Sequence, residues 1–380
     1  MREHLPQAAG AGGRATARLA VLLGTLLLLL GVWPAARAEA KLPDGFFGLD
    51  TVHHPSLEEF QQMKRNGGEV FRMQVIWRVV EPNPPVEVYG EQVRSYDFTR
   101  SDAEMRNLVA AGLQPQVTLI GSPEWVGDTF ATTPMQSEEG RDGWPAYVAA
   151  VVKRYGPDGS FWRENPLLPV TPPDVYQVWN EPNSEITYEP AANPKEYAKL
   201  FKLAAFQVQR LDPRAKMLPG GMFGTPQLDD SMYAWPFLEK FLGAKGVAGY
   251  VDGVAVHPYA KGLRGVKYQV RKIRNTLGKA GFRKMPLYIT ELGWSSEEPN
   301  GNIFYKGVKG QARSIDRALG LIMRNRRQWR LKRVLWFTWS DVTRQQAYSS
   351  GCGFCQKMGL VDTELAAKPA LASWRKYALP

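Results

Sequence analysis

An eightfold alternation of short apolar runs with longer amphipathic segments constrains the fold of this chain more than any other feature. Most of the apolar runs are continuous stretches of Val, Ile, Leu, Phe and Met, which is typical of parallel strands covered on their outer face. Repeated strand–helix alternation predicts a closed parallel barrel or a large doubly wound sheet. No G-x-G-x-x-G motif follows the first run, which weakens the nucleotide-binding form of the open sheet. We therefore predict an α/β fold, a single-domain (β/α)8 TIM barrel, with strands at Phe46–Leu49, Glu69–Ile76, Gln114–Ile120, Val175–Trp179, Met217–Gly220, Val251–Val256, Leu287–Thr290 and Val334–Trp339.

The connections between these elements differ in length at the two ends of the predicted barrel. The stretches 77–100, 121–142, 181–193 and 341–366 all follow strands, whereas the turns from helix back to strand, such as 66–68, are short. In a parallel barrel the loops after the strands build the active-site face. Long loops on that face, rich in Trp, Tyr, Asn and Pro, predict a walled cleft.

Two of the predicted strands end on a glutamate. The fourth strand runs into Asn180-Glu181-Pro182, and the seventh runs into Glu291. Because Pro182 has no N–H to donate, the fourth strand stops there and presents Glu181 at its C-terminal end. A single carboxylate in such a place is usually solvated or salt-bridged. Two carboxylates at the same end of strands four and seven are expected to approach each other across the barrel mouth.

Two carboxylates that face one cavity can cleave a glycosidic bond. One protonates the leaving oxygen and later deprotonates water, while the other attacks the anomeric carbon, which requires a separation of about 5–5.5 Å. The acid must keep its proton at the working pH, which a partly apolar wall can arrange. Trp125, Trp179 and Trp294 are candidates for that wall and for stacking on sugar rings.

The run Trp179-Asn180-Glu181-Pro182-Asn183 resembles the strand-four motif of the clan A retaining glycoside hydrolases, whose barrels carry the nucleophilic glutamate on strand seven. This resemblance, which extends from Gly48 to Asp341, implies that Glu181 is the acid/base, that Glu291 is the nucleophile and that Asn180 contacts the sugar 2-hydroxyl. Within the clan the sequence is most similar to glycoside hydrolase family 39, on Trp77, Tyr96-Asp97-Phe98 and Gly121-Ser122-Pro123-Glu124-Trp125. Family 5 shares much of this pattern and is the next candidate.

Other positions carry the same resemblance to the clan. Arg72 resembles the arginine that supports the nucleophile, and His257 and Tyr259 form the His-x-Tyr pattern that contacts substrate and nucleophile. Trp336 and Trp339 fall where the clan keeps a tryptophan under the bound sugar. Relatives usually carry that tryptophan at the position of Phe337, so the sequence does not decide which of the two serves. A structural ion pair for Arg72 and core packing for the aromatic residues are the alternatives.

Residues 1–38 have the composition of a secretory signal peptide. Arg14 and Arg18 precede an apolar run of 14 residues, Leu19 to Val32, and Ala36-Arg37-Ala38 provides an A-x-A cleavage site. The run is shorter than the ~20 residues that a membrane-spanning helix needs. We therefore expect cleavage and no stable membrane insertion, with an uncleaved anchor as the alternative. In either case residues 39–380, the predicted catalytic domain, would be secreted or associated with the cell envelope.

Charge and cysteine content limit the classes of binding partner and metal site that the sequence supports. The formal net charge is +11, and about +8 remains without residues 1–38, which hold four Arg and one Glu. The basic clusters at 261–284 and 324–333 match no nucleic-acid motif, so we expect no nucleic-acid partner. Solvated helix faces are the simplest explanation, and attraction to an acidic polysaccharide or the cell surface is the sharper one. The two cysteines, Cys352 and Cys355, favour a local disulfide over zinc, which needs about four ligands.

Together these features predict a monomeric, secreted, retaining glycosidase that cleaves β-glycosidic bonds of a polysaccharide or oligosaccharide, with no metal and no cofactor. One alternative is a sugar-binding barrel without turnover. Another is a transglycosylase that acts in exopolysaccharide metabolism. The sugar, its linkage and the choice between endo and exo cleavage stay open, with β-xyloside, β-glucan and exopolysaccharide as candidates.

Overall fold

The computed structural model describes residues 42–226, 228–297, 303–349 and 351–379. The chain divides into two units, Met1–Leu42 and Pro43–Pro380, and the second contains all the elements described below. The predicted signal peptide, residues 1–38, lies outside the described residues. In the described part of the chain, no helix combines the length and the apolarity needed to cross a membrane.

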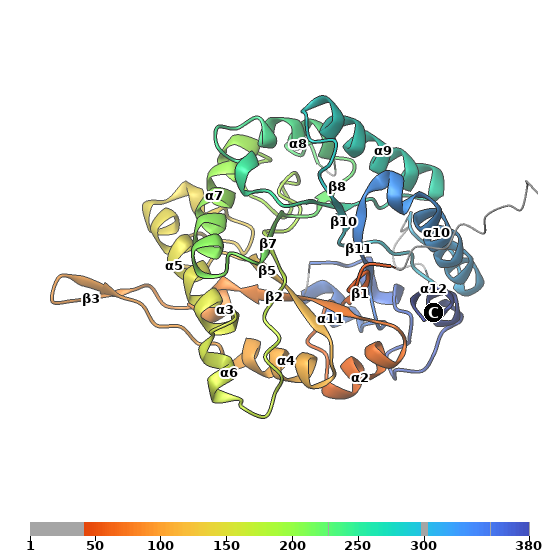
Figure 1. Ribbon diagram of the computed structural model, residues 1–380, viewed down its shortest axis with the longest axis horizontal. Coiled ribbons are helices and arrows are strands. Elements are labelled where there is room, and N and C mark those ends of the chain that lie inside the picture. Colours follow the sequence, from red (N-terminus) through yellow and green to blue (C-terminus); the bar gives the residue numbers. More distant parts are fainter. Residues whose placement is uncertain (1–41, 227, 298–302, 350, 380) are drawn as a thin grey trace, which may run out of the picture. The chain divides into compact units, whose positions relative to one another are not determined.

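A parallel nine-stranded sheet curls into a barrel at the centre of the second unit (Figure 1). Its strand order is β7-β6-β5-β2-β1-β11-β10-β9-β8, so the two outermost members are β7 and β8. These are consecutive pieces of one strand, separated only by Gly220 and Gly221, so the chain itself closes the barrel. The predicted eight-stranded barrel is thereby confirmed, with its fifth strand bent into two. The strands are β1 Phe47–Asp50, β2 Val70–Ile76, β5 Gln114–Ile120, β6 Val175–Val178, β7 Lys216–Pro219, β8 Met222–Phe223, β9 Val254–His257, β10 Leu287–Ile289 and β11 Leu331–Phe337.

A long helix follows each of the eight strands and packs on the outside of the barrel (Figure 1). The first of them begins after Ser56, which forms a capping box with Glu59. Successive helices lie against each other around the ring, with α9 beside both α8 and α10. The eight helices are α2 Leu57–Arg65, α4 Thr99–Ala110, α5 Glu138–Tyr155, α7 Pro194–Leu211, α8 Ala234–Leu242, α9 Leu263–Lys279, α10 Val308–Trp329 and α12 Pro369–Ala378.

Shorter elements fill the long loops that follow the strands. An antiparallel hairpin, β3 Val86–Val88 and β4 Glu91–Val93, projects from the barrel at the left of Figure 1. Its side chains are exposed along both strands. The remaining short helices are α3 Trp77–Val80, α6 Ser160–Glu164 and α11 Arg344–Ser349, with 3-10 turns η1 Pro134–Gln136, η2 Ala248–Tyr250 and η3 Cys355–Lys357.

A chain of buried polar side chains occupies part of the barrel interior. Arg333 pairs with Asp174 and donates to the Gln116 amide oxygen at 2.9 Å. Gln116 in turn donates to Gln177 at 3.3 Å, and Gln177 accepts from Arg72 Nε at 3.2 Å. Gln116, Gln177 and Arg72 are buried, and these hydrogen bonds offset part of the cost of burying them, although the Gln177 amide nitrogen has no partner among the described residues. Asp174 lies at the exposed end of the series. The series ends at Arg72, which it holds in place beneath the barrel mouth.

Candidate active site

Five polar residues meet at the carboxyl ends of the strands, and all of them except Asp50 were predicted from the sequence. Glu291 lies two residues beyond β10 and Glu181 three residues beyond β6, while His257 and Asp50 are the last residues of β9 and β1. Arg72 reaches the same region from within β2. Since the carboxyl ends of parallel strands meet at one end of the barrel, residues far apart in the sequence share one buried cluster.

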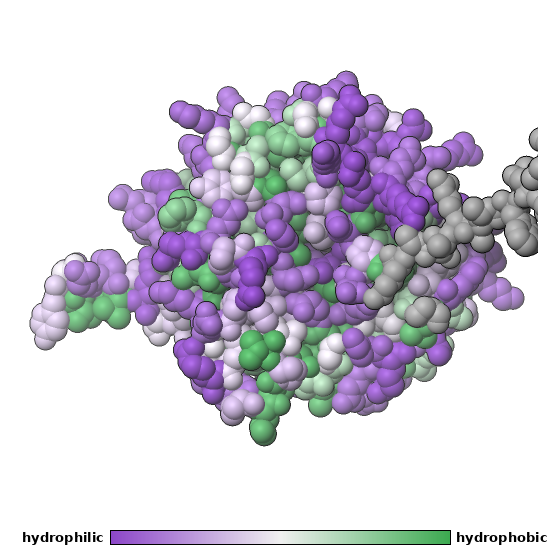
Figure 2. All heavy atoms as spheres, viewed as in Figure 1, coloured by the Kyte–Doolittle hydropathy of each residue, from purple (hydrophilic) through white to green (hydrophobic). Residues whose placement is uncertain are grey.

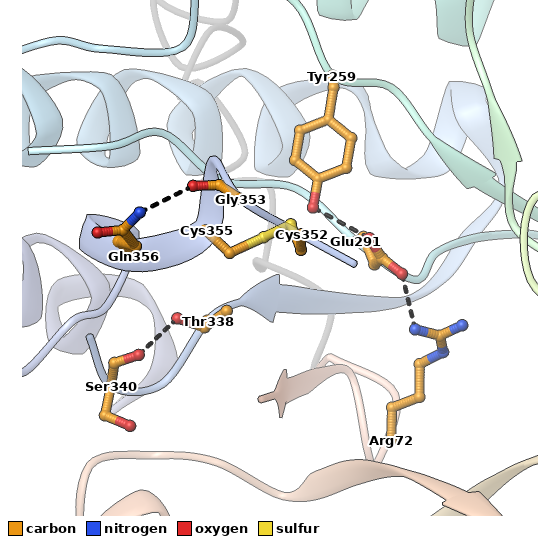
Figure 3. The surroundings of a disulfide bond; sticks show 9 residues. All are labelled: Arg72, Tyr259, Glu291, Thr338, Ser340, Cys352, Gly353, Cys355 and Gln356. Atoms are coloured by element: carbon orange, nitrogen blue, oxygen red, sulfur yellow. Dashed lines mark hydrogen bonds and ion pairs between the residues drawn. A yellow bond between two sulfur atoms is a disulfide. The ribbon is translucent and has the colours of Figure 1, made fainter. Parts of the chain in front are cut away.

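Glu291 is held by a hydrogen bond at each carboxylate oxygen. Arg72 Nη1 donates to Glu291 Oε1 at 2.7 Å, and the Tyr259 hydroxyl donates to Glu291 Oε2 at 3.1 Å. Figure 3 shows Glu291 between these two side chains. All three residues are buried. Two fixed donors define the direction of the carboxylate, which is the condition for a nucleophile that attacks along one line.

Glu181 has a histidine as its neighbour. His257 Nδ1 lies 2.7 Å from Glu181 Oε1, and His257 Nε2 lies 3.0 Å from the Thr290 hydroxyl. The ring fits only because Gly221 lacks a side chain: a Cβ there would come within 1.9 Å of His257 Nε2. The glycine that bends the fifth strand therefore also makes room for the imidazole.

The backbone around Glu181 adopts an unusual conformation. Trp179 has a φ of 68° and Glu181 a φ of 43°, both in the left-handed region that non-glycine residues rarely occupy. Two contacts hold the segment: the Glu181 N–H donates to the Gly221 carbonyl at 3.2 Å, and the Thr187 hydroxyl donates to the Glu181 carbonyl at 2.8 Å. Such conformations persist where the surroundings fix them, often at functional sites.

The two carboxylates lie close enough to act on one bond. One oxygen of Glu181, one oxygen of Glu291 and one ring nitrogen of His257 all lie within 4.8 Å of one another. Three such groups have the chemistry of a metal site. However, Arg72 already pairs with Glu291 Oε1, and both His257 nitrogens have oxygen partners in the protein. Arg72 and oxygen atoms of the protein thus already engage Glu291 Oε1 and both His257 nitrogens, atoms that a metal ion would need.

Burial and charge separate the pKa values of the two glutamates. Burial, followed by the nearby Glu291 carboxylate, raises the pKa of Glu181 well above its usual range. Burial also raises the pKa of Glu291, to about 7, but Arg72 and the Tyr259 hydroxyl oppose this shift. Burial and the Arg72 charge lower the pKa of His257, so its ring is neutral near pH 7. The arrangement therefore favours a protonated Glu181 beside an ionised Glu291, which is the division of labour that two-carboxylate catalysis needs.

Of the other predicted site residues, some lie in the cluster of Glu181 and Glu291 and some lie outside it. Asn180 lies in the cluster, where its side-chain oxygen accepts from Arg72 Nη2 at 2.8 Å. Trp125 lies outside it, edge-on to Trp77 at 5.4 Å with its indole N–H on the Glu81 carbonyl. Two further wall candidates are buried: Trp179 packs against Trp144 and Tyr188, and Trp294 donates to the Ala260 carbonyl.

Neither tryptophan predicted beneath the sugar has an exposed ring. Trp336 is fully buried and packs against Trp294 at 6.0 Å, and Trp339 is fully buried as well. The residue of β11 that lies near Tyr259 is Phe337, with ring centroids 6.5 Å apart. Since successive side chains of a strand point to opposite faces, Phe337 and Trp336 cannot both face the mouth. The structure thus places a phenylalanine where clan relatives usually carry the tryptophan.

Sequence reasoning missed a layer of phenylalanines around Tyr259. Phe223 stacks on the Tyr259 ring at 5.6 Å, while Phe304 and Phe354 lie 5.5 Å and 6.4 Å from it. Phe354 sits between Cys352 and Cys355, which the structure joins in a disulfide (Figure 3). No motif marks these phenylalanines, because they come from three different segments, one strand and two loops. The disulfide loop therefore contributes a side chain to the packing behind the catalytic cluster.

Asp50 was also missed, although a signal for it existed. It is buried at the end of β1 and accepts from Arg72 Nη1 at 2.8 Å. Its place in the sequence, a carboxylate that ends an apolar strand, is the same signal that identified Glu181 and Glu291. Applying that rule to the first strand would have found it.

Comparisons with known proteins agree with this geometry. The family model described as glycosyl hydrolase catalytic core matches residues 169–360. A β-xylosidase from Geobacillus stearothermophilus is 26% identical over 242 residues, which are 55% of this chain and 43% of that protein. The chain thus spans less than half the length of this curated relative.

Solved structures show the same fold at lower identity. A glycoside hydrolase family 39 enzyme from Xanthomonas axonopodis pv. citri superposes with a TM-score of 0.62 and 21% identity, covering 89% of this chain and 67% of that one. A monomeric β-xylosidase from Caulobacter crescentus gives a TM-score of 0.60 and 21% identity, covering 88% and 69%. At this identity the two structures show the fold alone, and together with the family model and the curated relative they confirm the predicted likeness to the clan A glycoside hydrolases, with a family 39 enzyme among the matching folds.

Proposed function

Because the chain belongs to the glycosyl hydrolase catalytic core family, we propose that it is a retaining glycosidase that cleaves β-glycosidic bonds with Glu181 and Glu291. The observation that carries the proposal is the approach of the two carboxylates within 4.8 Å. Retaining enzymes hold their carboxyl groups about 5–5.5 Å apart, whereas inverting enzymes need roughly 6.5–9.5 Å to admit a water molecule. The short separation supports direct attack by one carboxylate.

In the first step, Glu291 attacks the anomeric carbon while Glu181 transfers its proton to the departing oxygen. The bond between sugar carbon and leaving oxygen breaks as the bond to the Glu291 carboxylate forms. Arg72 and Tyr259 fix the attacking carboxylate, and the raised pKa of Glu181 keeps its proton available. The Asn180 oxygen is engaged by Arg72, so its amide NH2 is the end available to donate to a sugar hydroxyl.

In the second step, Glu181, now ionised, removes a proton from water. The hydroxide equivalent attacks the anomeric carbon and releases the Glu291 carboxylate, so both residues return to their starting states. His257 contacts Glu181 at 2.7 Å and, with its lowered pKa, stays neutral. A neutral ring beside Glu181 orients it without adding a positive charge that would favour loss of its proton.

The substrate and location form the finer part of the proposal. We assign the chain to a β-linked oligosaccharide or polysaccharide, and β-xylosides are the first substrates to test, because the matched curated relative is a β-xylosidase. The signal-like composition of residues 14–38 supports action outside the cytoplasm. A single barrel with its own buried site supports a monomer as the working unit.

Product stereochemistry tests the mechanism. Proton NMR of the sugar released from an aryl β-glycoside should show the β-anomer first, before mutarotation. In Glu181→Ala, azide should restore turnover and yield a β-glycosyl azide, since azide needs no proton removed. Glu124→Gln changes an exposed carboxylate in the loop after β5 and should behave as the unchanged protein. Initial release of the α-anomer would contradict the proposal.

A further inference from the structure

Helix α9 exposes a row of cations with no acidic residue among them. Its sequence contains six Lys or Arg and no Asp or Glu. Arg264, Lys267, Arg271 and Lys279 are exposed, and their spacing of three, four and eight residues places them along one side of the helix. Within the described residues, none of these four forms an ion pair. Figure 2 shows hydrophilic side chains gathered over α9 and α10, at the upper right of the view.

An exposed aromatic cluster adjoins this row. Tyr233 and Trp235, at the start of α8, stack with ring centroids 4.7 Å apart, and Tyr268 of α9 meets Trp235 edge-on at 5.8 Å. The Lys272 ammonium lies 5.6 Å from the Trp235 ring and 5.3 Å from that of Tyr268. Tyr233 is 45% exposed and Tyr268 52%, so these rings are not part of the core. Grouped rings at the surface mark interaction sites more often than chance packing.

We propose that Tyr233, Trp235 and Tyr268, together with the α9 cations, form a second glycan-binding surface that takes a linear anionic polysaccharide. The aromatic rings offer flat apolar faces for sugar rings. The cation row offers charge-assisted hydrogen bonds to carboxylate groups repeated along such a chain. Neither feature touches the carboxylate pair, so this surface is distinct from the catalytic site.

The surface lies close to the loop that carries Glu181. Asn183 donates to the Met232 carbonyl at 2.7 Å, and the Met232 N–H donates to the Asn183 carbonyl at 2.8 Å. This pair ties the segment before Tyr233 to the segment after Glu181. A chain held on α8 and α9 would therefore stay near the catalytic mouth, which raises its effective concentration there. This consequence rests on the proposed function, whereas binding itself does not.

The apolar side of α9 argues against a membrane surface as the partner. Interfacial helices bury an apolar face among lipid chains. On α9 that face, which includes Val266, Val270 and Ile273, is buried within the protein. Cations and aromatic rings remain on the outside, and this combination matches a charged glycan better than a bilayer.

Affinity electrophoresis of the full chain in native gels that contain alginate, a linear polyuronate, tests the proposal. Alginate should retard the unchanged protein, and added salt should weaken the effect. Tyr268→Ala combined with Trp235→Ala, and separately Lys267→Gln combined with Arg271→Gln, should each raise the apparent Kd at least fivefold. Matched controls are Tyr89→Ala at the exposed hairpin tip and Lys195→Gln with Lys199→Gln on α7, which should bind as the unchanged protein. If the Tyr268→Ala, Trp235→Ala double variant folds poorly, Tyr268→Ala alone takes its place, because Tyr268 is exposed, and it should also weaken binding.

Each outcome separates this surface from its rivals. Equal weakening by the α7 control pair, or no retardation of the unchanged protein, would overturn the proposal. If the α9 variants still bind alginate but no longer bind phosphatidylglycerol vesicles, the surface is a lipid-binding surface instead. Turnover of a short aryl glycoside should be unchanged in every variant, because the catalytic cluster is untouched. If alginate binds as predicted but no glycoside is ever hydrolysed, the proposed function fails and this proposal stands.

Discussion

Asp50 and Glu291 share a single nitrogen of one arginine: Arg72 Nη1 donates to Asp50 Oδ2 at 2.8 Å and to Glu291 Oε1 at 2.7 Å. All three groups are buried, so one cation serves two carboxylates where solvent screens them little. Asp50 thereby limits how far Arg72 can lower the pKa of Glu291, and its own charge raises that pKa. Asp50 is in this sense a positioning residue that acts on the proposed nucleophile through Arg72.

Replacing Asp50 by Asn should move the acid limb of the pH–rate profile to lower pH. The substitution removes a negative charge that raises the pKa of Glu291, so Glu291 ionises at lower pH and is a weaker nucleophile. Removing one partner of a buried pair costs about 3–5 kcal/mol, so Tm should fall as well. The measurement is kcat/KM against pH. Asp174→Asn, which breaks the pair with Arg333 at the other end of the polar series, should leave the limb in place. An unshifted limb in Asp50→Asn would refute this role.

The unchanged protein should show a bell-shaped dependence of kcat/KM on pH. Activity requires ionised Glu291 and protonated Glu181. The acid limb should therefore rise near pH 7, where Glu291 loses its proton, and the alkaline limb should fall at the higher pKa of Glu181. In Glu181→Gln, assayed with an activated leaving group, the alkaline limb should disappear. Persistence of that limb would assign it to another group.

Gly221→Ala should damage the site more than the fold. A Cβ at this position would lie 1.9 Å from His257 Nε2 and 2.6 Å from the Thr290 hydroxyl, so the imidazole must move away from Glu181. Overpacking of this kind costs about 1–3 kcal/mol of stability. We expect kcat/KM to fall by more than tenfold and Tm to fall by a few degrees. Gly249→Ala, where a Cβ meets nothing within 4 Å, is the control. A variant as active as the control would show that the position of His257 does not matter.

Loss of the disulfide should lower activity more than stability. The Cys352–Cys355 bond closes a very short ring, so little unfolded-state entropy is involved. Its loop, however, places Phe354 against the Tyr259 ring, and Tyr259 donates to Glu291. Cys352→Ser with Cys355→Ser should change Tm little and reduce kcat severalfold. Adding Phe354→Ala to that variant should bring little further loss, because both changes remove one support. Fully additive losses would separate the disulfide from this packing.

The barrel was predictable from sequence because its strands are mostly buried apolar runs and its helices carry amphipathic patterns, three of them (α2, α5 and α7) with side-chain N-caps. The strand at 114–120 was predicted with its observed bounds, and the Ser-x-x-Glu pattern at Ser56 is a local signal for the observed start of α2. The start of helix α5 at Glu138, which the Ser137 side chain caps, is harder to see in the sequence, because Gly140, Gly143 and Pro145 interrupt the helical pattern there. Local pattern also missed the bend between β7 and β8, where Gly221 faces His257 of another strand, a contact that sequence pattern does not show.

The site residues also divide into those that local sequence marks and those whose place depends on the whole fold. Glu181 and Glu291 were predicted from strand-end position and family resemblance together, and Arg72 from the resemblance alone. The aromatic residues were harder, since burial rather than residue type decides which ring faces the mouth. Trp336 packs against Trp294 on the opposite face of β11, and Phe337 lies near Tyr259. Contacts between loops, such as those of Phe304 and Phe354, depend on the whole fold and leave no periodic signal.

The central claim, that Glu291 is the nucleophile of a retaining glycosidase, is tested most directly by trapping the covalent intermediate. Intact-protein mass should be measured after incubation with 2-fluoro-β-glycosides of several sugars, beginning with the xyloside. The account predicts a mass gain of one 2-fluoroglycosyl group, located by peptide mapping on Glu291 and absent from Glu291→Gln. Glu181→Gln should still be labelled when the leaving group is activated, because it needs no proton. A label on any other residue, or turnover by Glu291→Gln at the rate of the unchanged protein, would contradict the account.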